Sequence, residues 1–228
     1  MPGFKRATVA VALLVQCAWA ADEVSISAAE KQLFTTDHLS DLPQAATLRY
    51  DFVKSGTLEK GYKDDVTMSV GKSQSNGGGK HVSVKFLNGD HRVELPELDD
   101  ARGNPIVMFF LEHDVREMQR ITRGQSNYYR RRIRVALADH ATSRPVTFDW
   151  GGHAVKGTVI EVEPYRDDPV KQRFEKYANK KYEFTLSDEV PGSIYKLRTI
   201  MGTPGAEVGS GGSPVLVEEV LTLRGVDR

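Results

Sequence analysis

Apolar and polar residues alternate in several short runs along the first half of the chain, and these runs predict β-strands. The runs cover residues 48–53, 66–70, 81–86 and 92–95. Alternation with a period of two gives a strand one buried face and one wet face. The pair Asn88-Gly89 separates the last two runs, and it is a strong signal for a tight hairpin. We therefore expect an antiparallel meander in this half.

The middle of the chain changes to the spacing of an α-helix. Asn104 and Pro105 suit the N-cap and the first helical position, and Gly124 suits the stop, so residues 106–123 should form one helix. The residues at 106–111 are all apolar, and later apolar residues recur at helical spacing. A helix that is apolar all round at its start and one-sided later should begin inside the protein and emerge toward its end.

The stretch at 125–137, QSNYYRRRIRVAL, fits two templates. As a strand, it would place Ile133, Val135 and Leu137 on one face. As a helix, it would place Tyr129, Ile133 and Leu137 on a buried stripe, with most of the arginines opposite. Arginine, alanine and leucine are strong helix formers, so we favour a helix that directly follows the first one.

More strands and two short helices complete the pattern. A capping box at Ser27 predicts a short helix at 27–34, and Asp168-Pro169 opens another. Further strands are expected at 146–150, 158–162, 182–186, 194–200 and 215–223, with a glycine-rich loop at 202–212. Because these helices and strands need one another to bury their apolar faces, residues 21–228 should form a single α+β domain.

The first twenty residues have the order of a cleavable secretory signal. Two basic residues precede an apolar run at 7–15, and Ala18-Trp19-Ala20 supplies a cleavage site, so residues 1–20 are interpreted as a signal peptide. The apolar run is too short to span a bilayer. Cys17 also follows this run, as the cysteine of a bacterial lipoprotein signal does, but Gln16 before it is not small. We expect a periplasmic protein, and an outer-membrane lipoprotein anchored through Cys17 is the second choice.

Charge and cysteine content exclude some classes of partner. Without residues 1–20, the chain loses two of 31 lysines and arginines and none of 31 acidic residues, which leaves 29 against 31 and a net charge of about −2. Such a chain has no global basic field, so nucleic acid is not expected as a partner. The only cysteine is Cys17, so the exported domain would rest on a buried core without disulfides.

The sequence contains no set of residues with the spacing typical of an active site or of a metal site. The histidines never occur at metal-ligand spacing on one predicted element, so no metal and no cofactor are expected. His113 lies between Glu112 and Asp114, and we interpret it as a histidine at the edge of the helix. An enzyme is the least supported of the possible classes.

Arg132 is the arginine of the basic run that helical geometry does not place on the wet face. On the helical wheel it lies beside the buried stripe, where an unpaired charge would be costly. We predict that Arg132 is partly buried and forms an ion pair within the fold.

An antiparallel meander, two central helices and then more hairpins with a third short helix is an order that resembles the periplasmic lipoprotein-carrier superfamily of the LolA and LolB type. The resemblance covers most of the exported chain and lies in the order of elements, without a shared motif. It implies a curved antiparallel sheet, an open half-barrel, packed around two or three helices over an apolar cavity. It also implies a lipid or lipoprotein ligand, with Tyr50, Phe52, Met108, Phe109 and Phe110 as candidate lining residues.

Two functions follow as expectations. The first is a non-enzymatic carrier that binds an apolar or acylated ligand between sheet and helices. The alternative is an envelope interaction or structural protein with a filled core, which uses its basic helix surface in peripheral contact with an anionic envelope surface. An empty or a filled space between sheet and helices would distinguish the two.

Overall fold

A computed structural model describes residues 26–202 and 214–227. The predicted signal peptide at 1–20, with Cys17, and nearly all of the predicted loop at 202–212 lie outside these ranges.

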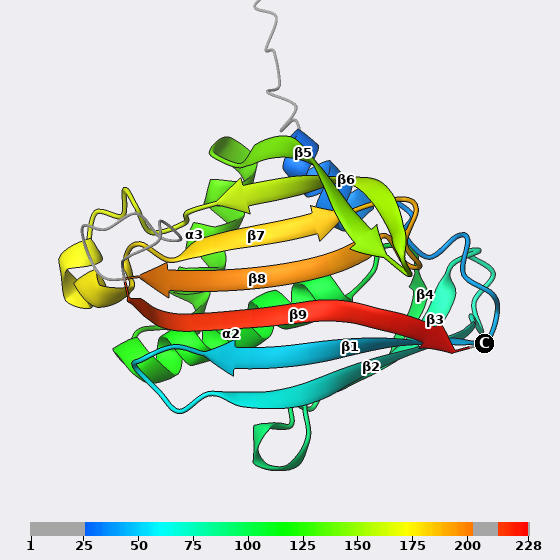
Figure 1. The fold of residues 1–228 in the computed structure, drawn as a ribbon, viewed down its shortest axis with the longest axis horizontal. Coiled ribbons are helices and arrows are strands. Elements are labelled where there is room, and N and C mark those ends of the chain that lie inside the picture. The colour runs from blue at the N-terminus through cyan, green and yellow to red at the C-terminus, as the bar shows by residue number, and fades with distance from the viewer. Residues whose placement is uncertain (1–25, 203–213, 228) are drawn as a thin grey trace, which may run out of the picture.

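One antiparallel sheet of nine strands forms the body of the molecule, in the order β4-β3-β2-β1-β9-β8-β7-β6-β5 (Figure 1). All pairs join strands that are consecutive in the chain except the pair of β1 with β9, which places β9 between β1 and β8. The sheet is curved and its two edge strands, β4 and β5, do not pair with each other. The strands are β1 Ala46–Ser55, β2 Tyr62–Lys72, β3 Lys80–Phe86, β4 Leu98–Ala101, β5 Thr142–Trp150, β6 His153–Val162, β7 Lys181–Leu186, β8 Ile194–Gly202 and β9 Val215–Asp227.

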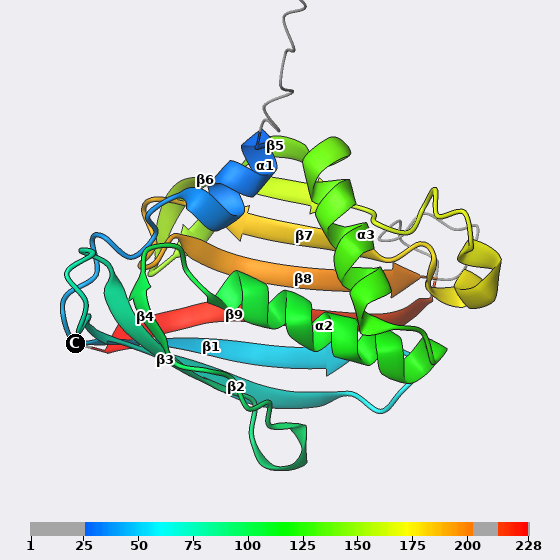
Figure 2. The ribbon, with the colours of Figure 1, turned by 180° about the vertical axis from the view of Figure 1, so that it is seen from behind.

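The longer helices cover one face of this sheet, as Figure 2 shows. They are α2, Ile106–Thr122, and α3, Ser126–Asp139, and the short α1, Ala28–Glu30, continues into a π-helical turn, η1, Lys31–Thr35. Two 3-10 segments complete the fold, η2 at Gly89–His91 and η3 at Lys171–Tyr177. The predicted fold class, an α+β open half-barrel around helices, is confirmed.

Alternation along the strands explains which face carries the helices. In β1, Leu48, Tyr50 and Phe52 point to the same side and are fully buried. The opposite face carries charged pairs, such as Arg198 with Glu183 at 2.9 Å and with Glu218 at 2.6 Å. The apolar face therefore packs on the helices, and the charged face meets water.

The basic stretch forms a helix, as favoured from its composition. Tyr129, Ile133, Ala136 and Leu137 of α3 are buried, which is the stripe that the helical template predicted. Gly124 permits the close approach of α3 to the end of α2, since a Cβ there would lie 2.3 Å from the Tyr129 hydroxyl. The left-handed residue that ends α2 is Arg123, with φ 60°, and Gly124 follows it.

The prediction of a tight hairpin at Asn88-Gly89 is wrong. The Asn88 side-chain amide donates to Asp64 Oδ1 at 2.6 Å, and Gly89 enters the 3-10 segment η2 instead of a two-residue turn. The expected strand at 92–95 makes only an isolated bridge between Val93 and Phe86, and the strand that does pair with β3 is β4. The Asn88 side chain hydrogen-bonds to residues of β2, and the chain forms a longer loop here in place of a two-residue hairpin turn.

The start of α2 is less completely enclosed than its composition predicted. Ile106, Val107 and Phe110 are fully buried, but Met108 is 50 % exposed. Met108 points to the side of α2 that faces away from the sheet, because the sheet covers only one side of the helix. The run of apolar residues at 106–111 therefore supplies both core and surface.

Candidate functional site

The residues predicted to line a ligand cavity lie in two different places. Tyr50, Phe52 and Phe110 are at most 1 % exposed, and Phe109 is 7 % exposed, so these four side chains fill the space between α2 and the sheet. Burial raises the pKa of the Tyr50 hydroxyl well above its usual value, and the Asn104 amide nitrogen lies 3.3 Å from that hydroxyl. Only Met108 reaches the surface.

Met108 lines an apolar groove on the outer side of the helix layer, which we call the helix groove. It lies between η1, α2 and α3, and its volume is about 320 Å³. This volume is at the lower end of the range for small-molecule sites, which is roughly 300–1,000 Å³. The groove is lined by Glu30, Phe34, Met108, Leu111, Glu112, Val115, Arg130, Ile133, Arg134 and Leu137.

Two arginines of α3 lie at the rim of the helix groove in different electrostatic settings. Arg130 is bound to Glu112, with Nη2 2.7 Å from Oε1 and Nε 2.8 Å from Oε2. Arg130 lowers the pKa of the Glu112 carboxyl, and burial opposes it. Arg134 is exposed and has no ion-pair partner among residues 26–202 and 214–227. The rim therefore carries one neutralised and one free guanidinium.

Charged side chains also lie between α2 and the sheet, and we call Lys54, His113, Asp114, Glu117, Lys180 and Glu219 the buried charge layer. In its first part, Lys54 Nζ lies 3.1 Å from Glu219 Oε1 and 2.7 Å from Glu117 Oε2. His113 Nε2 lies 3.5 Å from the same oxygen of Glu219. Burial alone would raise the pKa of the Glu219 carboxyl, but His113, Lys180 and Lys54 outweigh burial and lower it to about 2.

The second part of the buried charge layer centres on Asp114. Its carboxylate forms an ion pair with Lys180 and accepts a hydrogen bond from the Tyr182 hydroxyl at 2.5 Å. The hydroxyls of Tyr182 and Tyr165 are 3.2 Å apart. Burial and the nearby Asp114 charge raise the pKa of both hydroxyls far above the usual value. Each buried charge of this part therefore has an opposite charge or a hydroxyl donor beside it.

His113 was expected at the helix edge, and that interpretation is wrong. The side chain is only 8 % exposed and its ring packs edge-on against Phe52, with ring centroids 5.5 Å apart. The spacing of α2 explains this, because His113 follows Phe109 and Phe110 by four and three residues and so shares their buried side.

Arg132 lies beside the buried stripe of α3 and its side chain is 24 % exposed. Its Nε is 3.0 Å from Asp168 Oδ2, and its Nη2 donates to the Pro164 carbonyl at 3.2 Å. The Tyr128 hydroxyl donates to both oxygens of Asp168, at 2.5 and 2.6 Å, and burial together with Asp168 raises the pKa of Tyr128 to about 12. This ion pair ties α3 to the segment before η3.

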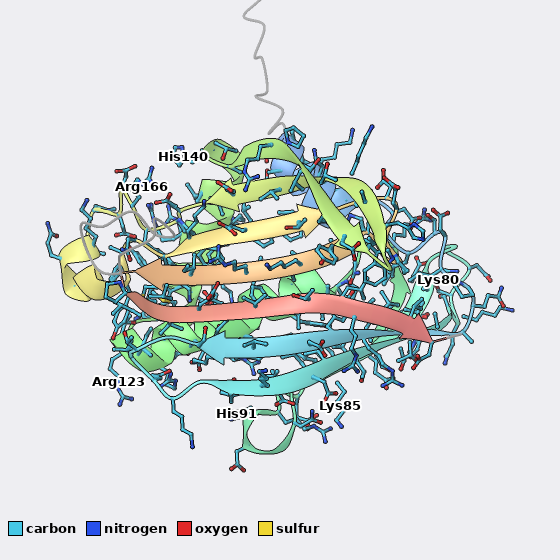
Figure 3. The ribbon with its side chains drawn as sticks, viewed as in Figure 1. Lys80, Lys85, His91, Arg123, His140 and Arg166 are labelled. Atoms are coloured by element: carbon cyan, nitrogen blue, oxygen red, sulfur yellow. The ribbon has the colours of Figure 1, made fainter. Side chains whose placement is uncertain are left out.

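The described ranges contain neither a cluster of metal-ligating side chains nor a membrane-spanning helix. Within residues 26–202 and 214–227 no group of three or more His, Cys, Asp or Glu side chains has a geometry that could hold a metal ion. No helix in the same ranges is both long and apolar enough to cross a membrane. Figure 3 labels basic side chains around the outline of the molecule, namely Lys80, Lys85, His91, Arg123, His140 and Arg166.

Comparisons with known proteins give no family by sequence. No protein-family model matches the chain, and no curated protein matches it. Among solved structures, it is similar to lipoprotein LppX of Mycobacterium tuberculosis, with 12 % identity and a TM-score of 0.30, over 78 % of this chain and 84 % of that one. It is also similar to a LolA-superfamily protein of Nitrosomonas europaea, with 9 % identity and a TM-score of 0.23, over 86 % of this chain and 92 % of that one. The assignment as an open half-barrel rests on the strand order and the helix placement alone.

Proposed function

We propose that this chain is a non-enzymatic periplasmic protein that binds an apolar or acylated ligand in the helix groove. The observation that supports the proposal is a concave, mostly apolar site on the helix face in which Met108 remains half exposed. Apolar surface gathered in a hollow is characteristic of ligand sites, whereas single exposed apolar residues are common on any protein.

The remaining predicted lining residues have a different place in the proposal. Tyr50, Phe52, Phe109 and Phe110 pack between α2 and the sheet. They would contact a ligand only in an opened form in which α2 has moved away from the sheet. The helix groove needs no such movement, so we assign the first contact of the ligand to Met108 and its neighbours.

Export is the second part of the proposal and depends on the sequence of residues 1–20. Their basic start, short apolar run and Ala18-Trp19-Ala20 support secretion with cleavage after residue 20. N-terminal sequencing of protein from the periplasm should begin near Ala21. A protein that begins with an acylated Cys17 would instead indicate a lipoprotein of the outer membrane.

Native mass spectrometry of protein purified from the periplasm tests the ligand. We expect a second mass peak from a bound lipid, and we expect the purified protein to bind a fluorescent fatty acid at a one-to-one ratio. Met108→Glu should abolish both signals, because a carboxylate in the groove would have to be desolvated beside an acyl chain.

Leu58→Glu is the matched control, since Leu58 is 38 % exposed and lies outside the groove. It should leave binding of the fatty acid unchanged. Equal binding by wild type and Met108→Glu would contradict the assignment to the helix groove. Loss of binding in both variants would mean that an added negative charge weakens binding wherever it is placed, and the assignment to the helix groove would then lose its support.

The alternative function, an envelope interaction protein, is favoured by the filled space between α2 and the sheet and by the exposed arginines of α3. Arg131 and Arg134 have no ion-pair partner within the described part of the chain. Such a protein would bind vesicles that contain anionic lipid and leave neutral vesicles free. If Arg131→Gln with Arg134→Gln abolished vesicle binding while Met108→Glu retained it, the alternative would replace the carrier.

A further inference from the structure

The charges around the helix groove indicate what kind of end group its ligand carries. Both carboxylates of the lining are already engaged by donors. Glu112 accepts from Arg130 at 2.7 and 2.8 Å, and Arg116 lies 3.4 Å from it. Glu30 Oε2 accepts from the Ser27 backbone N–H at 3.0 Å as part of a capping box.

The cationic side of the rim is not balanced in the same way. Arg130 also donates from Nη1 to Asn127 Oδ1 at 2.7 Å, so each of its three guanidinium nitrogens already donates to an oxygen of the protein. Arg134 lines the same groove one helical turn later, is exposed, and has neither an ion pair nor a side-chain hydrogen bond with any described residue. Its planar guanidinium is therefore free to bind a carboxylate or a phosphate in the bidentate manner that arginine favours.

We propose that the ligand of the helix groove is a single-chain amphiphile with an anionic end group, and that Arg134 selects it. The chain packs against Met108, Leu111 and Ile133, and the carboxylate or phosphate lies at Arg134. This inference rests on the proposed function, because it names the ligand class of the same groove. A groove of about 320 Å³ has room for one slender chain and little more.

Arg131 provides a second positive charge near this end group. It precedes Arg134 by three residues on α3, so the two side chains are neighbours on the helix surface. Arg131 is exposed and no ion pair holds it in the described ranges. An anion at Arg134 therefore experiences two cations that the protein itself does not neutralise.

The experiment compares ligands that share one chain and differ only in charge. Isothermal titration of the wild-type exported chain, from Ala21 onward, would use dodecanoate and dodecyl phosphate below their micelle concentrations and the uncharged methyl dodecanoate below its solubility limit. We expect an anion to bind about five-fold more tightly than the ester, which corresponds to one exposed ion pair of about 1 kcal/mol. Raising the salt concentration should reduce the difference.

Arg134→Gln should lower the affinity for the two anions toward the affinity for the ester. Lys85→Gln is the control, because it also removes one positive charge, and Lys85 is exposed on β3 at the periphery of the molecule (Figure 3). Arg134 is exposed as well, so both variants should keep the wild-type circular dichroism spectrum and melting temperature.

The possible outcomes separate this inference from the proposed function. Equal affinity of wild type for the anions and the ester overturns the inference and leaves the proposed function intact. An equal loss in Arg134→Gln and Lys85→Gln also overturns it, because net charge would then explain the preference. If none of the three ligands binds, the inference and the proposed function are both overturned. The same holds if a second copy of the chain covers the groove in a dimer that Met108→Glu dissociates.

Discussion

At the scale of single residues, the buried charge layer is the feature that an ordinary core does not contain. Asp114 is completely buried and Lys180 is 2 % exposed, so neither charge reaches water. Moving such ions out of water costs several kcal/mol per ion, and the mutual attraction offsets that cost only while both partners are present. The stability of the domain therefore depends on pairing within the layer, not on either charge alone.

Removal of one partner of this pair should be more harmful than conversion of both. Lys180→Met leaves the Asp114 charge with the Tyr182 hydroxyl as its donor, and we expect a loss of about 3–5 kcal/mol in the free energy of unfolding. Adding Asp114→Asn should restore much of that loss, because the buried charge is then gone and the amide oxygen still accepts from Tyr182. Urea unfolding at neutral pH measures both, and additive losses would contradict the coupling.

The same layer predicts how stability changes in acid. The pKa of the Glu219 carboxyl is about 2 in the folded protein against an ordinary value of 4.5, so the unfolded chain binds its proton first as pH falls. The stabilisation by Glu219 is therefore complete above about pH 4.5 and is lost as pH falls toward 2. Glu219→Gln should flatten the fall of unfolding free energy over this range, whereas Glu94→Gln, at a side chain 81 % exposed, should not.

The sequence places the charged residues of this layer at positions that face the core. The usual expectation that charged residues are exposed hides this pattern. Lys54 follows Phe52 by two positions and Glu219 precedes Leu221 by two, so both lie on the apolar face of their strands. Asp114 follows Phe110 by four positions on α2. Periodicity thus predicts which face these residues occupy. It does not predict which of them meet, because Lys54, Asp114 and Glu219 come together only after the strands and α2 have packed.

At the scale of elements, Asn104 connects the start of α2 to β1 and to the turn before β8. Its Oδ1 accepts from the Ile106 backbone N–H at 3.1 Å, and its Nδ2 donates to the Gly192 carbonyl at 2.9 Å and lies 3.3 Å from the Tyr50 hydroxyl. The N-cap role was predictable from the Asn104-Pro105 pair. The link to Gly192 was not, because 88 residues separate the two and no local pattern relates them.

Asn104→Ala should cost more than loss of an ordinary cap. A cap contributes about 0.5–2 kcal/mol, and here the buried Tyr50 hydroxyl would also lose its hydrogen-bond partner, at about 1–3 kcal/mol more. Gln125→Ala at the start of α3 is the control, since the Gln125 side chain makes no cap hydrogen bond. Thermal unfolding of the two variants should show a clear drop in melting temperature for Asn104→Ala and little change for Gln125→Ala.

At the scale of the whole molecule, the order of strands and helices was sufficient to predict the open half-barrel. It was not sufficient to predict whether side chains fill the space between α2 and the sheet. Alternating runs placed nearly every strand, and the helix pattern placed α2 and α3. The error at Asn88-Gly89 came from side-chain hydrogen bonds to Asp64, which local turn rules do not contain. Whether the sheet encloses empty space depends on how tightly α2 packs on Phe52 and its neighbours, and the hydrophobic pattern is the same in both cases.

The central place of β9 predicts a difference between two proline substitutions. Thr222 of β9 pairs with both Asp51 of β1 and Lys196 of β8, whereas Thr147 of the edge strand β5 pairs only with Lys156. Thr222→Pro should lower the free energy of unfolding by about 2 kcal/mol or more, because it leaves a carbonyl of a neighbouring strand unsatisfied. Thr147→Pro should cost far less, and equal losses by urea unfolding would contradict the central role of β9.

The position of β9 also affects when the domain can fold during its synthesis. Strands β1 to β4 form one group and β5 to β8 another, and only β9 pairs with both. Residues 215–227 leave the ribosome after β1 to β8, so until then these two groups have no backbone pairing with each other. The sheet thus becomes continuous only once β9 has been synthesised, which keeps the nascent chain from completing the sheet before that point.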